Sequence, residues 1–303
     1  MRRYTLRQLD TFLEVVRTGS VSRAADNLHV TQPAVSMQLR QLEDSLGIPL
    51  LEAVGRQVRL TDAGREVEQC AAAAIARLKE LDDLVAGHLG LKKGKVELAV
   101  VSTAKYFMPM LLVRFRAMFP DIAISLQIHN RESILKLLAR NEVDLIIMGR
   151  VPDNMDCCSA EFATNPMGII CAPGHPLSRR RGADMSVLQG QQFVVREQGS
   201  GTRSTMQQLF DAHGIVPDIV MEMPSNETIK QAVMAGMGMS FLSLRTVRNE
   251  LAAGHLALVD IVGLPVVRQW YVTHLNAKRL SPAADALKHF LVEEAGPLVK
   301  AWA

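Results

Sequence analysis

The stretch from Val21 to Leu46 constrains this chain most, because its pattern predicts two short helices separated by a tight turn. Thr31 is a good N-cap residue, and Pro33 falls in the first turn, where a missing N–H leaves no intrahelical partner unsatisfied. The second helix is therefore expected to begin near Gln32. Only His29-Val30 remains for the bend between the helices. This spacing predicts a helix-turn-helix.

The second helix is predicted to have one buried face and one exposed face. At about 100° per residue, its apolar residues fall in a narrow wedge that faces a core. The other side carries Pro33, Ser36, Met37, Arg40, Gln41 and Asp44. Gln and Arg make paired hydrogen bonds to adenine and guanine edges, Ser reaches bases or phosphates, and a helix N-terminus favours phosphate. An ordinary helical bundle would also contain such a helix pair, but this polar face favours DNA binding.

Residues Leu6 to Gly64 resemble the winged helix-turn-helix of LysR-type transcriptional regulators. The shared motifs are the GSVSRAA start of the first short helix, the TQPAVS entry of the second, and the LG.PL.E....V.LT.AG pattern of the wing. The family usually has Phe-Glu-Arg after Pro-Leu, whereas this chain has Leu51-Glu52-Ala53, so a usual backbone-contacting arginine is missing. Arg56 or Arg59 can replace that phosphate contact, the other interpretation being a solvated hairpin tip.

Residues 1–61 are thus predicted to form a DNA-binding domain, with a first helix over Leu6–Val16 and a wing built from Leu50–Glu52 and Gln57–Leu60. The residues expected to contact double-stranded DNA are Ser22, Arg23, Thr31, Gln32, Pro33, Ala34, Ser36, Met37, Arg40, Gln41, Arg56 and Arg59.

Residues 62–94 are predicted to form a linker helix and a hinge. Thr61 can cap this helix, and its apolar residues alternate by four and three, as in the seam of a short coiled coil: Val67, Ala71, Ala74, Leu78, Leu81 and Val85. The stripe could pack on its own domain, but a heptad stripe leaving a DNA-binding domain favours pairing with a second copy. The family resemblance implies tetramers that are dimers of dimers.

Residues 95–303 alternate strand-like and helix-like segments, which predicts an α/β fold with a mostly parallel sheet and helices on both faces. Strands are expected at 96–101, 122–128, 143–148, 168–172, 192–196, 219–223, 239–242 and 266–274, and helices at 107–119, 133–140, 202–213, 227–235 and 282–299. This part resembles the effector-binding domain of the same family, which has the two-lobed architecture of type II periplasmic binding proteins. The first lobe would comprise 95–164 and 266–303, and the second 165–265.

A small ligand is expected in the cleft between these lobes, at the carboxyl ends of the strands. The candidate effector-binding residues are Ser102, Thr103, Ala104, Asn130, Arg131, Glu132, Gly149, Arg150, Gly201, Thr202, Arg203, Ser204, Asn226 and Glu227. The GSGTRS segment that contains Thr202 matches only the first part of a dinucleotide fingerprint, but its glycines and cap suit an anion. Arginines at a cleft bind carboxylate or phosphate, although surface ion pairs and helix caps are the alternative roles for these residues.

Within the family, the segments TAKYFMP, HNRES and DLIIMGRVP resemble the branch that regulates carbon-fixation (RuBisCO) operons. Members of that branch respond to phosphorylated sugars, phosphoenolpyruvate or nicotinamide nucleotides, so the resemblance implies an anionic effector. His129 departs from the small residue that is usual there, and the second lobe is less typical. A regulator of another pathway therefore remains the alternative.

Composition excludes several other classes of protein. With 303 residues and a net charge of only +3, the chain is not a non-specific nucleic-acid coat protein. Its cysteines Cys70, Cys157, Cys158 and Cys171 show neither metal-ligand spacing nor a secreted disulfide pattern. The N-terminus has no apolar leader segment, and no run of about 18 apolar residues occurs, so a cytoplasmic protein without a membrane span is expected.

The hypothesis from sequence is a ligand-responsive regulator that binds specific DNA, bends it and activates promoters, with RNA polymerase as a further partner. A solute-binding protein for uptake is the first alternative, but it would need an export signal. An enzyme is the second, but the chain contains no H-E-x-x-H, G-x-S-x-G or Walker motif. We therefore expect no catalytic residues, no cofactor and no metal site.

Overall fold

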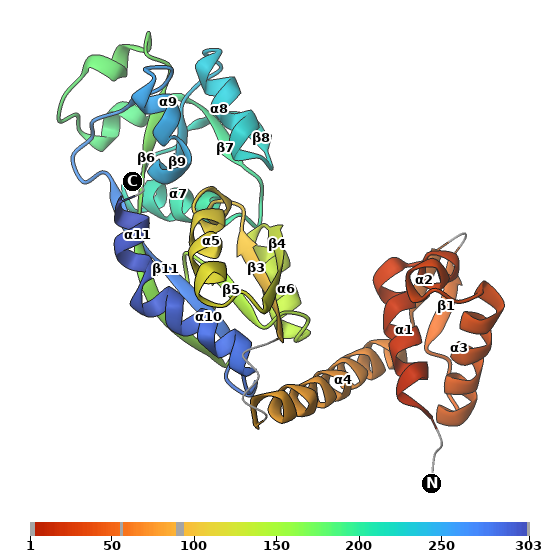
Figure 1. Ribbon diagram of the computed structural model, residues 1–303. Helices are drawn as coiled ribbons and strands as arrows, with labels where there is room; N and C mark the ends of the chain where they lie inside the picture. The colour runs from red at the N-terminus through yellow and green to blue at the C-terminus, as the bar shows by residue number, and fades with distance from the viewer. Residues whose placement is uncertain (1–3, 55–56, 89–93, 302–303) are drawn as a thin grey trace. The chain divides into compact units, whose positions relative to one another are not determined.

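The computed structural model describes residues 4–54, 57–88 and 94–301 and forms two compact units (Figure 1). The N-terminal domain contains three helices, a two-stranded wing and a long helix. These are α1 (Leu6–Thr18), α2 (Val21–Leu28), α3 (Gln32–Leu46), β1 (Leu51–Val54), β2 (Gln57–Leu60) and α4 (Asp62–His88). The winged helix-turn-helix predicted from sequence is confirmed.

Local capping explains where these helices begin and end. The side chains of Ser20 and Thr31 accept hydrogen bonds from backbone N–H groups in the first turns of α2 and α3, as N-cap residues do. Thr61 caps α4 in the same way, since its hydroxyl accepts from the Gly64 N–H at 2.9 Å. Gly47 ends α3 with a φ of 74°, a left-handed conformation that glycine adopts without strain.

The core of the N-terminal domain extends into α4. Phe12, Val15, Val35 and Leu42 are completely buried in its centre, and Ala71 of α4 belongs to the same cluster. The predicted coiled-coil stripe is therefore wrong for its first part, because that part packs on its own domain. Further along the helix Ala74 and Leu78 are exposed, whereas the side chains of Leu81 and Val85 lie outside the described part of the structure.

Gly64 allows α4 to approach the wing closely. A Cβ built at this position would lie 2.0 Å from the backbone oxygen of Leu50, so no other residue fits without moving the chain. Glu43 of α3 holds the same segment from the other side, because its Oε1 accepts from the Leu50 N–H at 2.7 Å. The wing, α3 and the start of α4 are thus joined by direct contacts.

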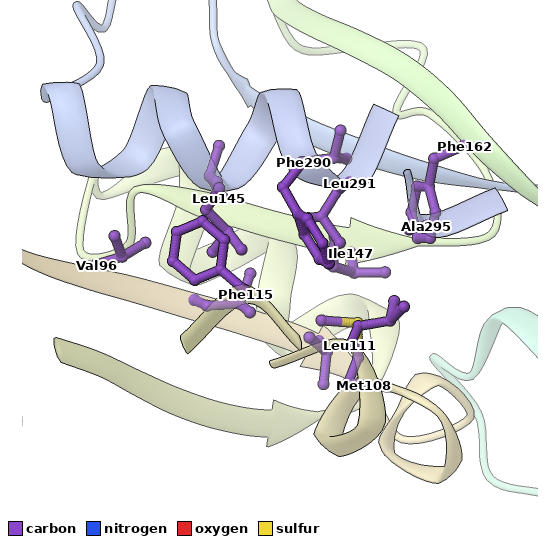
Figure 2. Close-up of a cluster of buried hydrophobic side chains, with 14 of the residues drawn as sticks. Val96, Met108, Leu111, Phe115, Leu145, Ile147, Phe162, Phe290, Leu291 and Ala295 are labelled. Atoms are coloured by element: carbon purple, nitrogen blue, oxygen red, sulfur yellow. The ribbon is translucent and has the colours of Figure 1, made fainter. Parts of the chain in front are cut away.

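The first lobe of the C-terminal domain is built around parallel strands. It contains β3 (Gly94–Val101), α5 (Met108–Met118), β4 (Ile122–His129), α6 (Arg131–Ala139), β5 (Leu145–Met148), β11 (Val266–Leu275), α10 (Pro282–Glu293) and α11 (Ala295–Ala301). Strand β3 pairs in parallel with both β4 and β5. Figure 2 shows the core of this lobe, where Phe115 and Phe290 meet among aliphatic side chains from β3, β5, α5 and α10.

The second lobe has its own core, centred on Phe193 and Phe210, whose rings meet edge to face. Its elements are β7 (Gln192–Arg196), α7 (Gly201–Ala212), β8 (Asp218–Met223), α8 (Asn226–Met234), β9 (Ser240–Ser243), α9 (Arg248–Ala252) and β10 (Ala257–Leu258), with 3-10 turns at Pro176–Arg179 and Met185–Leu188. Strands β7 and β8 are parallel.

Two long antiparallel strands join the lobes. Strand β6 (Cys157–Cys171) pairs with β11 over the whole length of β11, from Val266 opposite Met167 to Leu275 opposite Cys157. The prediction of a mostly parallel sheet is therefore wrong for this seven-stranded sheet, because β6 pairs antiparallel with β9, β10 and β11, and β11 pairs antiparallel with β5. Residues 157–167 carry no continuous apolar run that would reveal a strand. The single helix predicted over 282–299 is also wrong. Pro297 cannot donate to the carbonyl four residues earlier, and the helix breaks at Glu294.

Two further observations concern the described residues. None of their helices is both long and apolar enough to cross a membrane. They also contain no group of three or more His, Cys, Asp or Glu side chains arranged to hold a metal ion.

Candidate functional sites

A cleft between the two lobes contains most of the candidate ligand-binding residues. It encloses about 50 Å³ and is lined by Val101, Ser102, Thr103, Asn130, Arg131, Met148, Gly149, Arg150, Asn165, Met167, Arg196, Ser200, Gly201, Thr202, Ser204, Thr205, Arg268 and Trp270. Strands β3, β4 and β5 are parallel, so the residues that follow them meet at one edge of the sheet. The N-terminus of α7 supplies the opposing wall.

The candidate residues that line this cleft are Ser102, Thr103, Asn130, Arg131, Gly149, Arg150, Gly201, Thr202 and Ser204. The other five candidates do not line it. Ala104 is fully buried in the core of the first lobe. Glu132 is exposed and pairs with Lys136 at 2.7 Å, while Arg203 points towards Glu222, with 3.7 Å between the charged atoms. Glu132 and Arg203 line a separate, more open hollow beside the cleft.

Asn226 and Glu227 do not line the cleft either, and both side chains have partners within the protein. Asn226 is buried, and its Oδ1 accepts a hydrogen bond of 2.6 Å from Nη1 of Arg196. Glu227 pairs with Lys230 at 2.8 Å and accepts a hydrogen bond from the hydroxyl of Tyr106. Burial, followed by this contact with Glu227, raises the pKa of Tyr106, so the phenol remains a donor. Tyr106 therefore connects the first lobe to α8 of the second.

Sequence reasoning missed several residues that line the cleft, most importantly Arg196, Arg268 and Trp270. Arg196 ends an otherwise apolar strand, and that single charge was the available signal. Arg268 and Trp270 are two residues apart on β11, so the period of a strand places them on one face. Arg268 lies opposite Asn165 of β6, which also lines the cleft. The pairing of β6 with β11 thus completes the wall.

The cleft is strongly cationic. Four arginines line it, Arg131, Arg150, Arg196 and Arg268, and none of its lining residues is Asp or Glu. Arg196 is held by Glu197 through two hydrogen bonds of 2.7 and 3.0 Å, and its Nη2 donates to Oγ of Ser102 at 3.1 Å across the lobes. Burial, and then the neighbouring charge of Arg150, lowers the pKa of Arg131. Such a surface favours an anionic ligand.

Helix α7 adds to this preference because its N-terminus lies at the cleft. Ser200 occupies the N-cap position without a side-chain cap bond. The first N–H groups of a helix have no intrahelical partner, and together with the helix dipole they favour an anion.

The outer face of α3 is accessible in the N-terminal domain. Pro33, Met37 and Arg40 are exposed, with 54% of Met37 accessible, while Ala34 and Ser36 are half-buried. The hydroxyl of Thr31 caps the helix. Arg59 is exposed on β2 opposite Glu52, whereas Arg56 lies outside the described residues.

Some of the other candidate DNA-binding residues have partners inside the domain. Oε1 of Gln32 accepts from the hydroxyl of Ser22 at 3.2 Å, which joins the two helices of the motif. Oε1 of Gln41 accepts from Gln8 of α1 at 3.0 Å. The guanidinium of Arg23 donates to the backbone oxygen of Thr18. Arg40, the cation of α3, is exposed.

Comparison with known proteins gives matches over both domains. Residues 6–65 match a model described as bacterial regulatory helix-turn-helix protein, lysR family, and residues 90–296 match a model described as LysR substrate binding domain. The chain is 42% identical to the HTH-type transcriptional regulator CfxR of Cupriavidus necator over 97% of this chain and 92% of that protein. It is 43% identical to a RuBisCO operon transcriptional regulator of Allochromatium vinosum over 96% of each.

A solved structure, the Synechocystis CcmR regulatory domain in complex with 2-PG, is also similar. The TM-score is 0.63 at 38% identity, and the alignment covers 67% of this chain and 99% of that one.

Proposed function

This chain belongs to the LysR family of DNA-binding transcriptional regulators, and from that premise we propose that it controls carbon-fixation genes in response to a small anion bound between its lobes. The names of its relatives support the choice of pathway, since they include a regulator of a RuBisCO operon. The observation that carries the proposal is the cleft itself, which has four arginines and the N-terminus of α7 but no carboxylate in its lining.

The ligand is proposed to act by favouring one arrangement of the two lobes. Arg196 of the second lobe donates to Ser102 of the first, directly at the cleft. An anion there would compete for the same donor and add contacts to both lobes, which shifts the equilibrium between lobe arrangements. Through an oligomer this shift would change the spacing of the DNA-binding domains and hence the bending of DNA.

Specific DNA is proposed to be contacted by the outer face of α3. Arg40 is suited to the two acceptors of a guanine edge, and the exposed Met37 to an apolar contact with a thymine methyl group. Arg59 of the wing would contact phosphate, which positions the domain without reading sequence.

We extend the proposal to the assembly and setting of the protein. The exposed Ala74 and Leu78 of α4 would pair with a second copy, giving dimers and then tetramers that read repeated half-sites. The protein would work in the cytoplasm, recruit RNA polymerase and activate transcription, without catalysing a reaction. A regulator of another pathway with the same cleft is the second candidate, because the charges of the cleft favour an anionic ligand but do not determine which genes the protein controls.

Footprinting of the purified full chain on the DNA upstream of RuBisCO genes from the same genome tests this proposal, with and without 2-PG. We expect a protected region of repeated half-sites whose pattern shifts when 2-PG is added, and calorimetry should detect 2-PG binding to the protein alone. Protection of unrelated promoters only would refute the pathway. Binding of 2-PG with an unchanged footprint and unchanged DNA affinity would refute the coupling.

A further inference from the structure

Tyr106 of the first lobe reaches a polar cluster that belongs to the second lobe. It ends the short 3-10 turn Ala104–Tyr106 that follows β3, and its hydroxyl donates to Oε1 of Glu227 in the first turn of α8. Nζ of Lys230, one turn further along α8, lies 5.2 Å from the centroid of the tyrosine ring. A single side chain thus makes a hydrogen bond to a carboxylate and a cation–π contact across the two lobes.

The second-lobe side of this contact is charge-balanced without Tyr106. Nζ of Lys230 lies 2.8 Å from Glu227 and 2.8 Å from Glu250, so its charge stays paired when the lobes separate. The side chain of Glu227 is 50% exposed, and water can take the place of the tyrosine hydroxyl there. Because separation leaves no buried lysine charge unpaired, the contact can break and re-form without a large cost.

This contact is close in the chain to the ligand cleft but does not form its wall. Ser102, four residues before Tyr106, lines the cleft and so does Arg196, whereas Tyr106, Glu227 and Lys230 do not. Nη2 of Arg196 donates to Oγ of Ser102 at 3.1 Å. The segment after β3 is therefore joined to the second lobe twice, once at the cleft through Ser102 and once outside it through Tyr106.

Arg196 connects these two contacts. Its Nη1 donates to Oδ1 of Asn226 at 2.6 Å, and Asn226 is a buried residue that directly precedes Glu227 in α8. A group that draws Arg196 away from Ser102 therefore also acts on the first turn of α8, which carries the acceptor of the tyrosine hydroxyl.

We infer that Tyr106 is an interlobe latch: its contacts with α8 hold the two lobes together and set how often they separate before any ligand arrives. A latch must bias this equilibrium strongly enough to matter and weakly enough to release. One hydrogen bond to a half-exposed carboxylate, together with a cation–π contact, meets both conditions. The inference rests on the proposed function in one respect, namely that the arrangement of the lobes controls DNA binding.

Hydrogen exchange of the full chain, without ligand or DNA, tests the inference at a single amide. The backbone N–H of Glu132 in the first lobe donates to the backbone oxygen of Gly199 in the second lobe at 3.3 Å. Glu132 lies in the first turn of α6, where N–H groups have no intrahelical acceptor, so its protection depends on contact between the lobes. Its exchange rate, resolved by fragmentation in a mass spectrometer, therefore reports how often the lobes separate.

The variant Tyr106→Phe removes the hydroxyl and keeps the ring. We expect the Glu132 amide to exchange about 3- to 10-fold faster than in wild type, as for a lost hydrogen bond to a partly solvated carboxylate. Glu227→Met should also speed this exchange, and Tyr106→Phe should add nothing in that background, because both variants remove the same bond. Tyr271→Phe is the matched control, since the hydroxyl of this half-buried tyrosine on β11 makes no hydrogen bond to another described residue.

The outcomes distinguish a latch from a tyrosine that only stabilises the domain. An unchanged rate at Glu132 in Tyr106→Phe, or additive effects of the two variants, overturns the inference. Equally faster exchange in the buried strands β3 and β5 also overturns it, because the variant would then act on overall stability; we expect those strands and the melting temperature to remain as in wild type. Since neither ligand nor DNA is present, the proposed function can fail in footprinting while the latch stands, and the reverse.

Discussion

Replacement of Lys230 by methionine should destabilise the C-terminal domain strongly, because this lysine is the hub of a buried polar cluster. Only 4% of its side chain is exposed. Its Nζ lies 2.8 Å from Glu227, 2.8 Å from Glu250 and 3.1 Å from the backbone oxygen of Thr246. The variant leaves these acceptors without their shared cation.

The size of the effect follows from the exposure of the two carboxylates. Breaking a buried ion pair by removing one partner costs about 3 to 5 kcal/mol. The side chain of Glu227 is 50% exposed and can be solvated, but that of Glu250 is only 20% exposed, and its Oε2 is buried without a partner. We therefore expect a loss near the lower limit, about 3 kcal/mol, or a fall of roughly 6 to 12 °C in melting temperature for a domain of this size.

Thermal unfolding followed by tryptophan fluorescence measures this loss. Both tryptophans of the chain, Trp270 and Trp302, lie in the C-terminal half of the sequence, so the signal reports that domain. Lys136→Met is the matched control, since the Lys136–Glu132 pair is exposed on both sides and should contribute less than about 1 kcal/mol.

Two outcomes decide whether the reasoning holds. A Lys230→Met protein that melts within a degree of wild type would refute it. The double variant Lys230→Met with Glu250→Met should recover part of the loss, because apolar residues tolerate burial better than an unpaired carboxylate.

Three further predictions concern the N-terminal domain. Gly64→Ala places a Cβ 2.0 Å from the Leu50 oxygen, so DNA binding and helical circular dichroism should fall while ligand titration is retained. Arg40→Ala should weaken operator binding by about 1 to 3 kcal/mol in fluorescence anisotropy, and an equal loss on random DNA would contradict base reading. The hydrogen bond from Arg17, opposed by burial, lowers the pKa of Glu14 below 4.5. The stabilisation that the ionised Glu14 contributes is therefore present above that pH and lost as the pH falls below it. In urea titrations at several pH values, Glu14→Gln should flatten this pH dependence of the free energy of unfolding.

The fold could be predicted from sequence where its causes are local. The start of α3 follows from Thr31 and Pro33, and its buried face follows from the spacing of its apolar residues. All of these residues lie within the helix or next to it in the sequence. The pairing of β6 with β11 joins residues about a hundred positions apart in the sequence, and the polar start of β6 gives no period that reveals it. Such long-range pairing cannot be read from a short window.

The same distinction applies to the ligand cleft. Ser102 and Arg150 follow parallel strands, and the topology alone brings them together. Arg268 lies on β11, far along the chain from Ser102 and Arg150, and no local sequence pattern predicts that it joins them in the cleft. Asn226 shows the opposite error: it was taken as a cap or a ligand contact, but Ser225 caps α8 and Asn226 turns inward to Arg196.

Because Val67, Ala71 and Ile75 pack into the N-terminal core, we expect the DNA-binding domain and the first turns of α4 to move as one rigid body. An engineer who exchanges heads between regulators should therefore splice the chain after Ile75. A junction at Thr61 would remove these α4 residues from the hydrophobic core of the DNA-binding domain and replace them with those of another protein's helix.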